Sequence, residues 1–374
     1  MRYMEKSAIL LVRNKDLISE GILGKNLFEY TMDTLKTASI ETVYYCGNDV
    51  QDERLTYASS YKQLFDELSQ EEGRILLVDI DYPFLRPETL SAMLESEGNL
   101  VLADYADITD VFALDKADLN SLEELYFDQM PFGDDAEKMR VSDAPSLSIA
   151  KEFEKDRINR NWQEKGVHFE DPDRVYIGHD AELGKGVRLG IDVAVLGKSS
   201  VGEGSEIASF SRIENSTIGS DCRIGQTFMK DSSLGDRVRL GSYTEISNGC
   251  SFAEDVTIGG FSSLQNVSVG KSTSIGTHCS LSFTRIGDCV RIGSGVSAID
   301  PDGGDDDLVE IKDYAYIGNN VILVAPVTVG EIAAVAAGTT LTENVEDGDS
   351  VIGRTRQLTR KGMGLEYIAK ESKR

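Results

Sequence analysis

Residues 175–207 read VYIGHDAELGKGVRLGIDVAVLGKSSVGEGSEI, and an aliphatic residue returns at every sixth position. The series starts with Ile177, Leu183 and Leu189 and runs to Ile292, with a few five-residue steps such as Ile213 to Ile218. It resumes from Ile311 to Leu341. A six-residue period is neither helical nor that of a plain strand. It fits a short strand followed by a turn, with one aliphatic side chain pointing inward from each side.

Three such sides close one coil, so the series predicts a parallel β-helix of hexapeptide repeats with about nine coils. A glycine often follows the aliphatic residue, as in Leu183-Gly184 and Leu189-Gly190, and a small residue there suits a tight corner. A β-sandwich is the alternative, but its strands would recur at longer spacing and without a fixed phase of six.

One polar run interrupts the repeat between Ala298 and Val309, and it contains the sequence DPDGGDDD. Such a run does not fit inside a packed prism, so we expect a loop insertion at 298–309 that leaves one corner. The loop either reaches a neighbouring subunit or is only a solvated insertion.

The first part of the chain has a different pattern. Apolar runs at 8–12, 42–46, 75–79 and 100–103 read as buried strands, and helical spacing separates them, as for Phe28, Met32 and Leu35 or Tyr57, Tyr61, Leu64 and Leu68. This alternation predicts an α/β open sheet. Asp79 and Asp81 follow the third strand at the edge where ligands bind, so they either hold a divalent metal ion or simply end the strand.

The expected domain organisation follows from these patterns. Residues 1–125 form a truncated α/β domain, 126–172 a linker with a helix, 173–345 the β-helix and 346–374 a C-terminal tail. Within the linker, Ile149, Phe153, Ile158 and Trp162 predict an amphipathic helix that ends at Gly166.

Composition narrows the classes of function. The 64 acidic and 38 basic residues give a net charge of −26, which argues against binding nucleic acid or an anionic membrane. The five scattered cysteines form no CxxC pair, so they indicate neither a zinc site nor a disulfide framework. The apolar run Ala8–Val12 is too short for a signal peptide, and we expect a cytoplasmic protein.

An α/β sheet, a linker helix and a hexapeptide β-helix, in this order, resemble the bacterial bifunctional enzymes that make UDP-N-acetylglucosamine. These enzymes join an N-acetylglucosamine-1-phosphate uridylyltransferase to a glucosamine-1-phosphate N-acetyltransferase. The segments that carry the resemblance are Leu323–Gly330 (LVAPVTVG), Ala336–Thr340 (AAGTT), Ile286–Gly293 (IGDCVRIG), Asp81–Pro83 (DYP) and Glu88–Leu90 (ETL). The resemblance implies a nucleotidyltransferase-like sheet and a left-handed parallel β-helix that assembles as a homotrimer.

The resemblance also implies site residues. It assigns acetyl-CoA, or another acyl-CoA, to Gly293, Ser294, Asn319, Ala337 and Arg354, and a magnesium ion to Asp81. The family's general base falls at Thr277, with His278 one residue further along. On a strand that shift turns the side chain to the other face, so His278 serves only if the strand is bulged; otherwise it is an ordinary histidine.

Several positions depart from the family. The stretch Leu11–Asp16 lacks the family's glycine-rich phosphate loop, and Gly24-Lys25 is a poor substitute for it. The position of the family's second metal ligand falls near Ile108 or Thr109, beside Asp110. Where the family has cations for the sugar phosphate, this chain has Glu245, Ser247 and Gln265, and Ser280 replaces a tyrosine. The main hypotheses are an acyltransferase with an acceptor other than glucosamine 1-phosphate, or a non-catalytic trimeric scaffold. Faithful synthesis of UDP-N-acetylglucosamine is the third and least favoured alternative. Uridylyltransferase activity is not expected.

Overall fold

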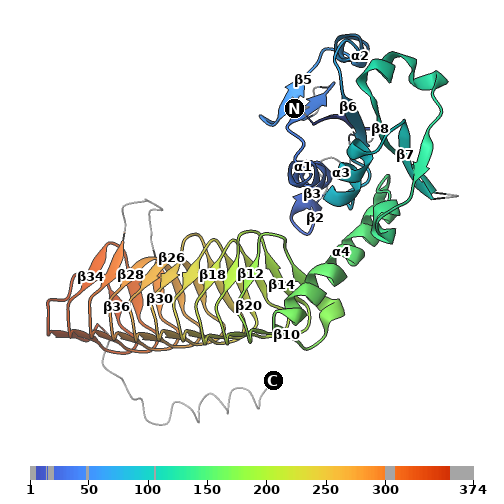
Figure 1. The fold of residues 1–374 in the computed structure, drawn as a ribbon. Coiled ribbons are helices and arrows are strands. Elements are labelled where there is room, and N and C mark those ends of the chain that lie inside the picture. Colours follow the sequence, from blue (N-terminus) through green and yellow to red (C-terminus); the bar gives the residue numbers. More distant parts are fainter. Residues whose placement is uncertain are drawn as a thin grey trace, which may run out of the picture. The chain divides into compact units, whose positions relative to one another are not determined.

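The computed structural model describes residues 6–13, 15, 21–47, 50–104, 107–299 and 308–353. The chain divides into two compact units (Figure 1). The first comprises Met1–Arg160 with Ile177–His179, and the second comprises Asn161–Tyr176 with Asp180–Arg374. The fold class expected from the sequence, an α/β open sheet followed by a parallel β-helix, is confirmed.

The first unit is built on a seven-stranded mixed sheet. Its strands, in spatial order, are β5 (Leu55–Tyr57), β4 (Thr42–Tyr45), β1 (Ser7–Leu11), β6 (Arg74–Asp79), β8 (Asp107–Asp115), β7 (Leu100–Asp104) and β9 (Asp128–Met130). Strands β5, β4, β1 and β6 are parallel, whereas β8 runs antiparallel to both β6 and β7. The four apolar runs are strands as predicted, while the antiparallel strand β8 was not anticipated.

Helices cover both faces of this sheet. Helices α1 (Leu27–Thr37) and α3 (Pro87–Glu95) pack on the face that holds Ala8 and Leu10, and α2 (Tyr61–Leu68) packs on the face that holds Ile9. Asn26 starts α1 through a capping box with Glu29, which satisfies two backbone N–H groups. Tyr57 was expected in a helix but ends β5 instead.

The remaining elements of the first unit are short, apart from α4. They are the hairpin of β2 (Gly21–Ile22) and β3 (Lys25–Asn26), and the 3₁₀ segments η2 (Lys116–Glu124) and η3 (Asp135–Lys138). Helix α4 (Ala144–Glu164) is the linker helix predicted from the sequence, but its expected apolar face is wrong because Ile149 is 61% exposed. The buried positions are Leu147, Ala150, Glu154, Lys155 and Asn159. Ion pairs of Glu154 with Arg157 and of Lys155 with Glu152 compensate the buried charges.

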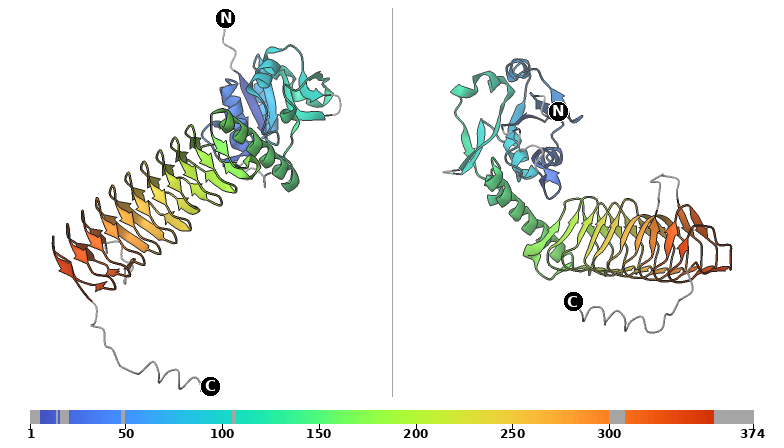
Figure 2. Two further views of the ribbon diagram at one scale, coloured as in Figure 1. Left: turned by 90° about the horizontal axis from the view of Figure 1, so that it is seen from below. Right: turned by 180° about the vertical axis from the view of Figure 1, so that it is seen from behind.

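The second unit is a parallel β-helix with three faces (Figures 1 and 2). Face 1 is an eleven-stranded sheet, one strand per coil. Its strands are β10 (His168–Phe169), β13 (Arg188–Leu189), β16 (Glu206–Ile207), β19 (Arg223–Ile224), β22 (Arg239–Leu240), β25 (Thr257–Ile258), β27 (Ser274–Ile275), β29 (Arg291–Ile292), β32 (Tyr316–Ile317), β35 (Ala334–Val335) and β37 (Ser350–Val351). The expectation of nine coils misses β10 and β37 because the aliphatic series starts after Phe169 and stops before Val351.

Faces 2 and 3 share the second sheet, which has seventeen strands. Face 2 contains β11 (Val175–Ile177), β14 (Val193–Leu196), β17 (Arg212–Glu214), β20 (Thr227–Lys230), β23 (Thr244–Ser247), β30 (Ser297–Ile299), β33 (Ile322–Val324) and β36 (Thr340–Leu341). Face 3 contains β12 (Glu182–Leu183), β15 (Ser200–Val201), β18 (Thr217–Ile218), β21 (Ser233–Leu234), β24 (Ser251–Phe252), β31 (Val309–Ile311) and β34 (Val327–Val329). Strands β26 (Ser263–Val269) and β28 (Ser280–Ile286) bend across both faces, and η4 (Pro172–Arg174) precedes the first coil.

Stacked aliphatic side chains fill the prism, as the six-residue period predicts. Ile177, Leu183 and Leu189 and their successors are buried, and Met229 fills the position between Ile224 and Leu234. The insertion is narrower than expected because Ala298 and Val309 are buried strand residues of β30 and β31. Residues 300–307 lie outside the described part of the chain.

Two kinds of residue shape the corners of the β-helix. Many corner residues adopt a left-handed φ without being glycine, including Phe210, Asp221, Tyr243, Phe261 and His278. The glycines that follow the aliphatic residues serve another purpose, which is close approach between coils. A Cβ atom on Gly241 would lie 2.2 Å from the backbone nitrogen of Gly260.

Candidate functional site

Buried carboxylates gather at the carboxyl edge of the first unit's sheet. Asp79 ends β6, Asp81 follows it, and both are almost completely buried. The Asp79 Oδ2 atom lies 3.1 Å from Nε of Arg13, and Oδ1 of Asp110 lies 2.8 Å from Nη2 of the same arginine. Asp81 Oδ2 lies 3.4 Å from Nη2 of Arg140. Two guanidinium groups therefore contact the three carboxylates at this edge.

These contacts bear on whether a metal ion fits. Burial raises the pKa of Asp79 to about 6 and also raises the pKa of Asp81. Asp79 Oδ2 and Asp81 Oδ1 accept no hydrogen bond from the described residues. However, the two arginines already neutralise most of the negative charge, and within the described ranges no three His, Cys, Asp or Glu side chains are arranged to hold a metal ion. The residues do not fit a magnesium site, and no chemical step is derived through one.

Asp79→Asn is expected to change how stability depends on pH. Because burial raises the pKa of Asp79 above its unfolded value, this group favours folding at low pH and loses that contribution as the pH rises through about 6. The difference in unfolding free energy between the variant and wild type should therefore shift by about 1–3 kcal/mol in favour of the variant as the pH rises from 4 to 8. Urea denaturation at several pH values measures this difference. A stability difference between variant and wild type that stays the same from pH 4 to pH 8 would contradict this prediction.

The first unit also lacks a phosphate loop in the described residues. Gly24 and Lys25, the poor substitute noted in the sequence, belong to the β2–β3 hairpin, whose turn is Leu23-Gly24 with both residues at a left-handed φ. The Lys25 ammonium group pairs with Asp33 and lies over the ring of Tyr30. Thr109 is buried and donates to the Leu102 carbonyl, whereas Ile108 is exposed.

The residues assigned to the cofactor come together in the β-helix. Thr277, Ser294, Asn319 and Ala337 follow Gly276, Gly293, Gly318 and Ala336 at one corner in successive coils. The Thr277 backbone N–H donates to Oγ of Ser294 over 3.1 Å, and the Ser294 N–H donates to Oδ1 of Asn319 over 2.8 Å. A column of small side chains thus runs along this corner, and we call it the cofactor column after the role that the sequence resemblance assigns to these residues, which stays a prediction. Arg354 lies outside the described residues.

His278 stands beside this column in a turn rather than in a strand. Its φ is 57°, and it lies between β27 and β28. The one-residue shift therefore does not turn its side chain into the core, and the ring is exposed. The imidazole stacks on Phe261, with ring centroids 5.1 Å apart and planes at 10°, and Phe261 stacks on Tyr243 at 4.9 Å. This aromatic ladder fixes the orientation of the imidazole.

The surface of face 2 next to His278 is lined by small polar side chains. Glu245, Ser263 and Ser280 are paired in register and point outward, as do Ser247, Gln265 and Ser282 in the next column. These six positions supply hydroxyls, one amide and one carboxylate. None of these six side chains offers a positive charge to a phosphomonoester.

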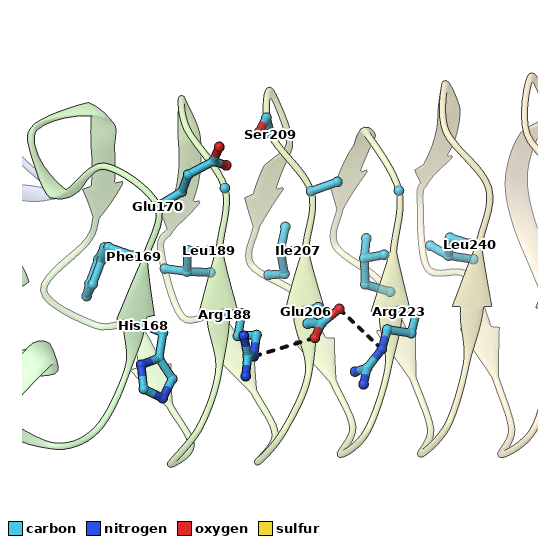
Figure 3. A pocket seen from close by; sticks show the side chains of 14 residues that line it. His168, Phe169, Glu170, Arg188, Leu189, Glu206, Ile207, Ser209, Arg223 and Leu240 are labelled. Atoms are coloured by element: carbon cyan, nitrogen blue, oxygen red, sulfur yellow. Dashed lines mark ion pairs between the residues drawn. The ribbon is translucent and has the colours of Figure 1, made fainter.

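A groove of about 630 Å³ lies on face 1 over the first coils. Figure 3 shows Arg188 and Arg223 on either side of Glu206, with His168 on the strand before Arg188. Nε of Arg188 is 3.6 Å from Oε1 of Glu206, and Nε of Arg223 is 3.3 Å from Oε2. The groove does not include any residue that the sequence assigned to a site.

Sequence reasoning missed the partners of the predicted residues. Phe261 and Tyr243 were not singled out, although each stands three residues before an inward aliphatic residue, as His278 does before Leu281. Arg13 and Arg140 gave no sequence signal, because their link to Asp79 and Asp81 depends on a contact between distant segments.

Comparison with known proteins adds to this geometry. No family model matches the chain. The bifunctional protein GlmU of Halalkalibacterium halodurans is 32% identical over 236 residues, and that of Staphylococcus haemolyticus is 29% identical over 369 residues. The second alignment covers 97% of this chain and 80% of the relative, so it spans both units. The chain is a divergent relative of the GlmU family.

Coverage differs between these GlmU alignments. The Halalkalibacterium alignment covers 63% of this chain, and one with the GlmU protein of Acaryochloris marina, at 33% identity, covers 60%. In both, the chain spans about half of the relative's length, 51% and 50%. Among solved structures, an Arabidopsis UDP-N-acetylglucosamine acyltransferase has a TM-score of 0.41 at 14% identity and covers 46% of this chain and 68% of its own.

A nucleotidyl transferase from Methanothermobacter has a TM-score of 0.33 at 14% identity, over 40% of this chain and 97% of its own. Within the described residues, no helix has both the length and the apolar character to cross a membrane.

Proposed function

We propose that this GlmU relative is an acyl-CoA-dependent acyltransferase that works as a homotrimer. The observation that carries the proposal is the cofactor column, because Ser294, Asn319 and Ala337 fall in register at one corner, Gly293 directly precedes Ser294, and His278 follows Thr277 in the neighbouring coil. The kinship to GlmU and the acyltransferase-type β-helix support it.

Each residue has a defined role in the proposal. His278 is the general base that removes the proton from the acceptor, since its exposed ring is oriented by Phe261 and is free of the core. The cofactor column is the surface that contacts the acyl-CoA, with Thr277 at its start. Arg354, from the tail, pairs with a cofactor phosphate.

The acceptor is a hydroxyl- or amine-bearing molecule without a phosphate. Face 2 beside His278 offers Glu245, Gln265 and serine hydroxyls, which suit hydroxyl groups or a protonated amine. The carboxylate of Glu245 would repel a phosphomonoester such as glucosamine 1-phosphate.

A non-catalytic scaffold is the second candidate. It is favoured by the first unit, where Arg13 and Arg140 occupy the acidic edge. In that case the β-helix retains the trimer and has lost acyl transfer.

The first unit is expected to have no uridylyltransferase activity. The reason is that the sequence Leu11–Asp16 contains no glycine and that Arg13 and Arg140 pair with the acidic edge. Pyrophosphate release from UTP, N-acetylglucosamine 1-phosphate and magnesium should match a control without protein. A turnover above ~0.1 per second would contradict this, since it lies within a hundredfold of a typical enzyme rate of roughly 10 per second.

Arg354→Ala is expected to weaken acetyl-CoA binding about 10- to 150-fold, because a well-formed contact between an arginine and a phosphate contributes roughly 1.5–3 kcal/mol. The melting temperature without ligand should stay unchanged. Calorimetry measures the affinity, and Arg360→Ala, a second arginine of the same tail, is the matched control. Equal affinities of the two variants would remove Arg354 from the cofactor site.

The proposed activity is tested by the release of free coenzyme A thiol from acetyl-CoA. A panel of amino sugars and polyols is compared with glucosamine 1-phosphate. Release that requires a phosphate-free acceptor supports the acyltransferase. Release with glucosamine 1-phosphate alone would refute the proposed acceptor class, and no release with any acceptor, despite bound acetyl-CoA, would favour the scaffold.

A further inference from the structure

Two arginines and three carboxylates form one network at the carboxyl edge of the first unit's sheet. Strands β1 and β6 are parallel and pair Leu11 with Asp79, so Arg13, two residues beyond Leu11, reaches the edge where β6 ends. Asp110 belongs to β8, the antiparallel neighbour of β6. The topology therefore brings one arginine and two carboxylates from three neighbouring segments together.

The second arginine comes from a later part of the chain. The N–H of Val141 donates to the carbonyl of Asp81 over 2.7 Å, and this contact brings Arg140 to the same edge. Nη2 of Arg140 lies 3.4 Å from Oδ2 of Asp81 and 4.0 Å from Oδ2 of Asp110. Like Arg13, which contacts Asp79 and Asp110, this guanidinium lies between two carboxylates, and Asp110 is common to both.

Burial makes a cation necessary at this edge. The side chains of Asp79 and Asp81 are 0% and 1% exposed, and a buried carboxylate is strongly unfavourable unless an opposite charge compensates it. The side chains of Arg13 and Arg140 are 52% and 40% exposed, so they supply that charge while staying in contact with solvent. Bridging several carboxylates with concentrated positive charge is also what a bound divalent cation does.

Two buried carboxylate oxygens keep free lone pairs. Among the described residues, neither Oδ2 of Asp79 nor Oδ1 of Asp81 accepts a hydrogen bond, although the former lies within ion-pair distance of Arg13. The guanidinium groups thus supply charge without saturating these oxygens. Carboxylate oxygens are the ligands that magnesium prefers, and one or two carboxylates suffice when water completes its coordination shell.

We propose that Arg13 and Arg140 replace a divalent cation at this edge, holding the three carboxylates together and keeping a metal ion out. A guanidinium cannot lose its proton in a folded protein, so the replacement is permanent and independent of the metal supply. The acidic edge then acts as a clamp between segments that are far apart in sequence. The inference concerns the first unit alone and does not depend on the proposed acyltransferase.

Removal of both cations tests the replacement. Arg13→Met with Arg140→Met should create a metal site that the wild type lacks, because the buried carboxylates are then left without a counter-charge. Mn²⁺ is the probe, since it takes the same carboxylate and water ligands as magnesium. Titration of the full chain, with free Mn²⁺ followed by electron paramagnetic resonance, should show one site per chain in the variant. Its dissociation constant should be at least tenfold lower than that of any site in wild type.

Two further variants are the controls. Arg54→Met with Arg174→Met changes the net charge equally, but these arginines pair with Asp52 and Asp192, away from the edge. This control should gain no such site. Adding Asp81→Asn to the Arg13→Met and Arg140→Met variant should abolish the gained site, because the amide has no charge to attract the ion.

A milder variant keeps the test decisive if the double variant does not fold by circular dichroism. Arg140→Met alone should melt roughly 3 °C higher in ~10 mM magnesium chloride than in sodium chloride of equal ionic strength, whereas wild type should show no difference. A wild-type site as tight as that of the variant, or no metal binding in either variant, overturns the replacement. In the second case the arginines are ordinary ion-pair partners. Acetyl-CoA is absent from these measurements, so their failure leaves the acyltransferase untouched.

Discussion

His278→Phe is expected to lower kcat for acyl transfer by about 100- to 10,000-fold, the usual contribution of a general base. Phenylalanine preserves the stack on Phe261 and tolerates the left-handed φ, as Phe261 itself does, but it has no ring nitrogen. The trimer, the melting temperature and the acetyl-CoA affinity should stay close to wild type. Steady-state kinetics together with calorimetry checks all four quantities.

The matched control for His278 is Phe261→Leu, which keeps the imidazole and removes its stacking partner. We expect a smaller loss in kcat, because the base is present but less well oriented. If His278→Phe retains full activity, another group removes the proton, and Thr277 beside Ser294 becomes the residue to test.

Gly241→Ala is expected to destabilise the β-helix by about 3 kcal/mol, at the upper end for an overpacked interior. The added Cβ would lie 2.2 Å from the backbone nitrogen of Gly260 and 2.8 Å from its Cα. Backbone atoms on both sides belong to stacked coils, so relief would separate neighbouring strands. Chemical denaturation followed by circular dichroism measures the loss.

The control for Gly241 is Gly338→Asn. Gly338 has a left-handed φ, a Cβ atom added to it would meet no atom within 4 Å, and Asn320 occupies the same corner position one coil earlier at a φ of 55°. This variant should cost less than about 1 kcal/mol. Equal losses at the two positions would show that conformational freedom, and not close approach, explains the glycines.

The six-residue period predicted the β-helix because each side of a coil buries one apolar side chain in the prism. The same requirement therefore recurs with every side along the chain. Between Ile224 and Leu234 the inward position is occupied by Met229, which is unbranched but equally buried. The coils beyond the series were missed for a similar reason, since Phe169 is aromatic and only half-buried.

The chemistry was less predictable because it depends on contacts between coils and between distant segments. His278 lies in a turn with a left-handed φ, and the sequence does not mark this corner with a glycine. Because the residue is not in a strand, the one-residue shift does not turn its side chain to the opposite face. The pairing of Asp81 with Arg140 depends on the segment after η3 returning to the sheet edge, where the Val141 N–H donates to the Asp81 carbonyl. The residues of the cofactor column lie at one corner of successive coils, and their role in binding a cofactor stays a prediction.

The central claim is that this chain binds an acyl-CoA in its β-helix. Isothermal titration calorimetry of the wild-type protein with acetyl-CoA tests it most directly, with UDP-N-acetylglucosamine and magnesium as the comparison. The account predicts saturable binding of acetyl-CoA, weakened by Arg354→Ala, and no binding in the comparison. Absence of acetyl-CoA binding at millimolar concentration would contradict the acyltransferase and leave the non-catalytic scaffold.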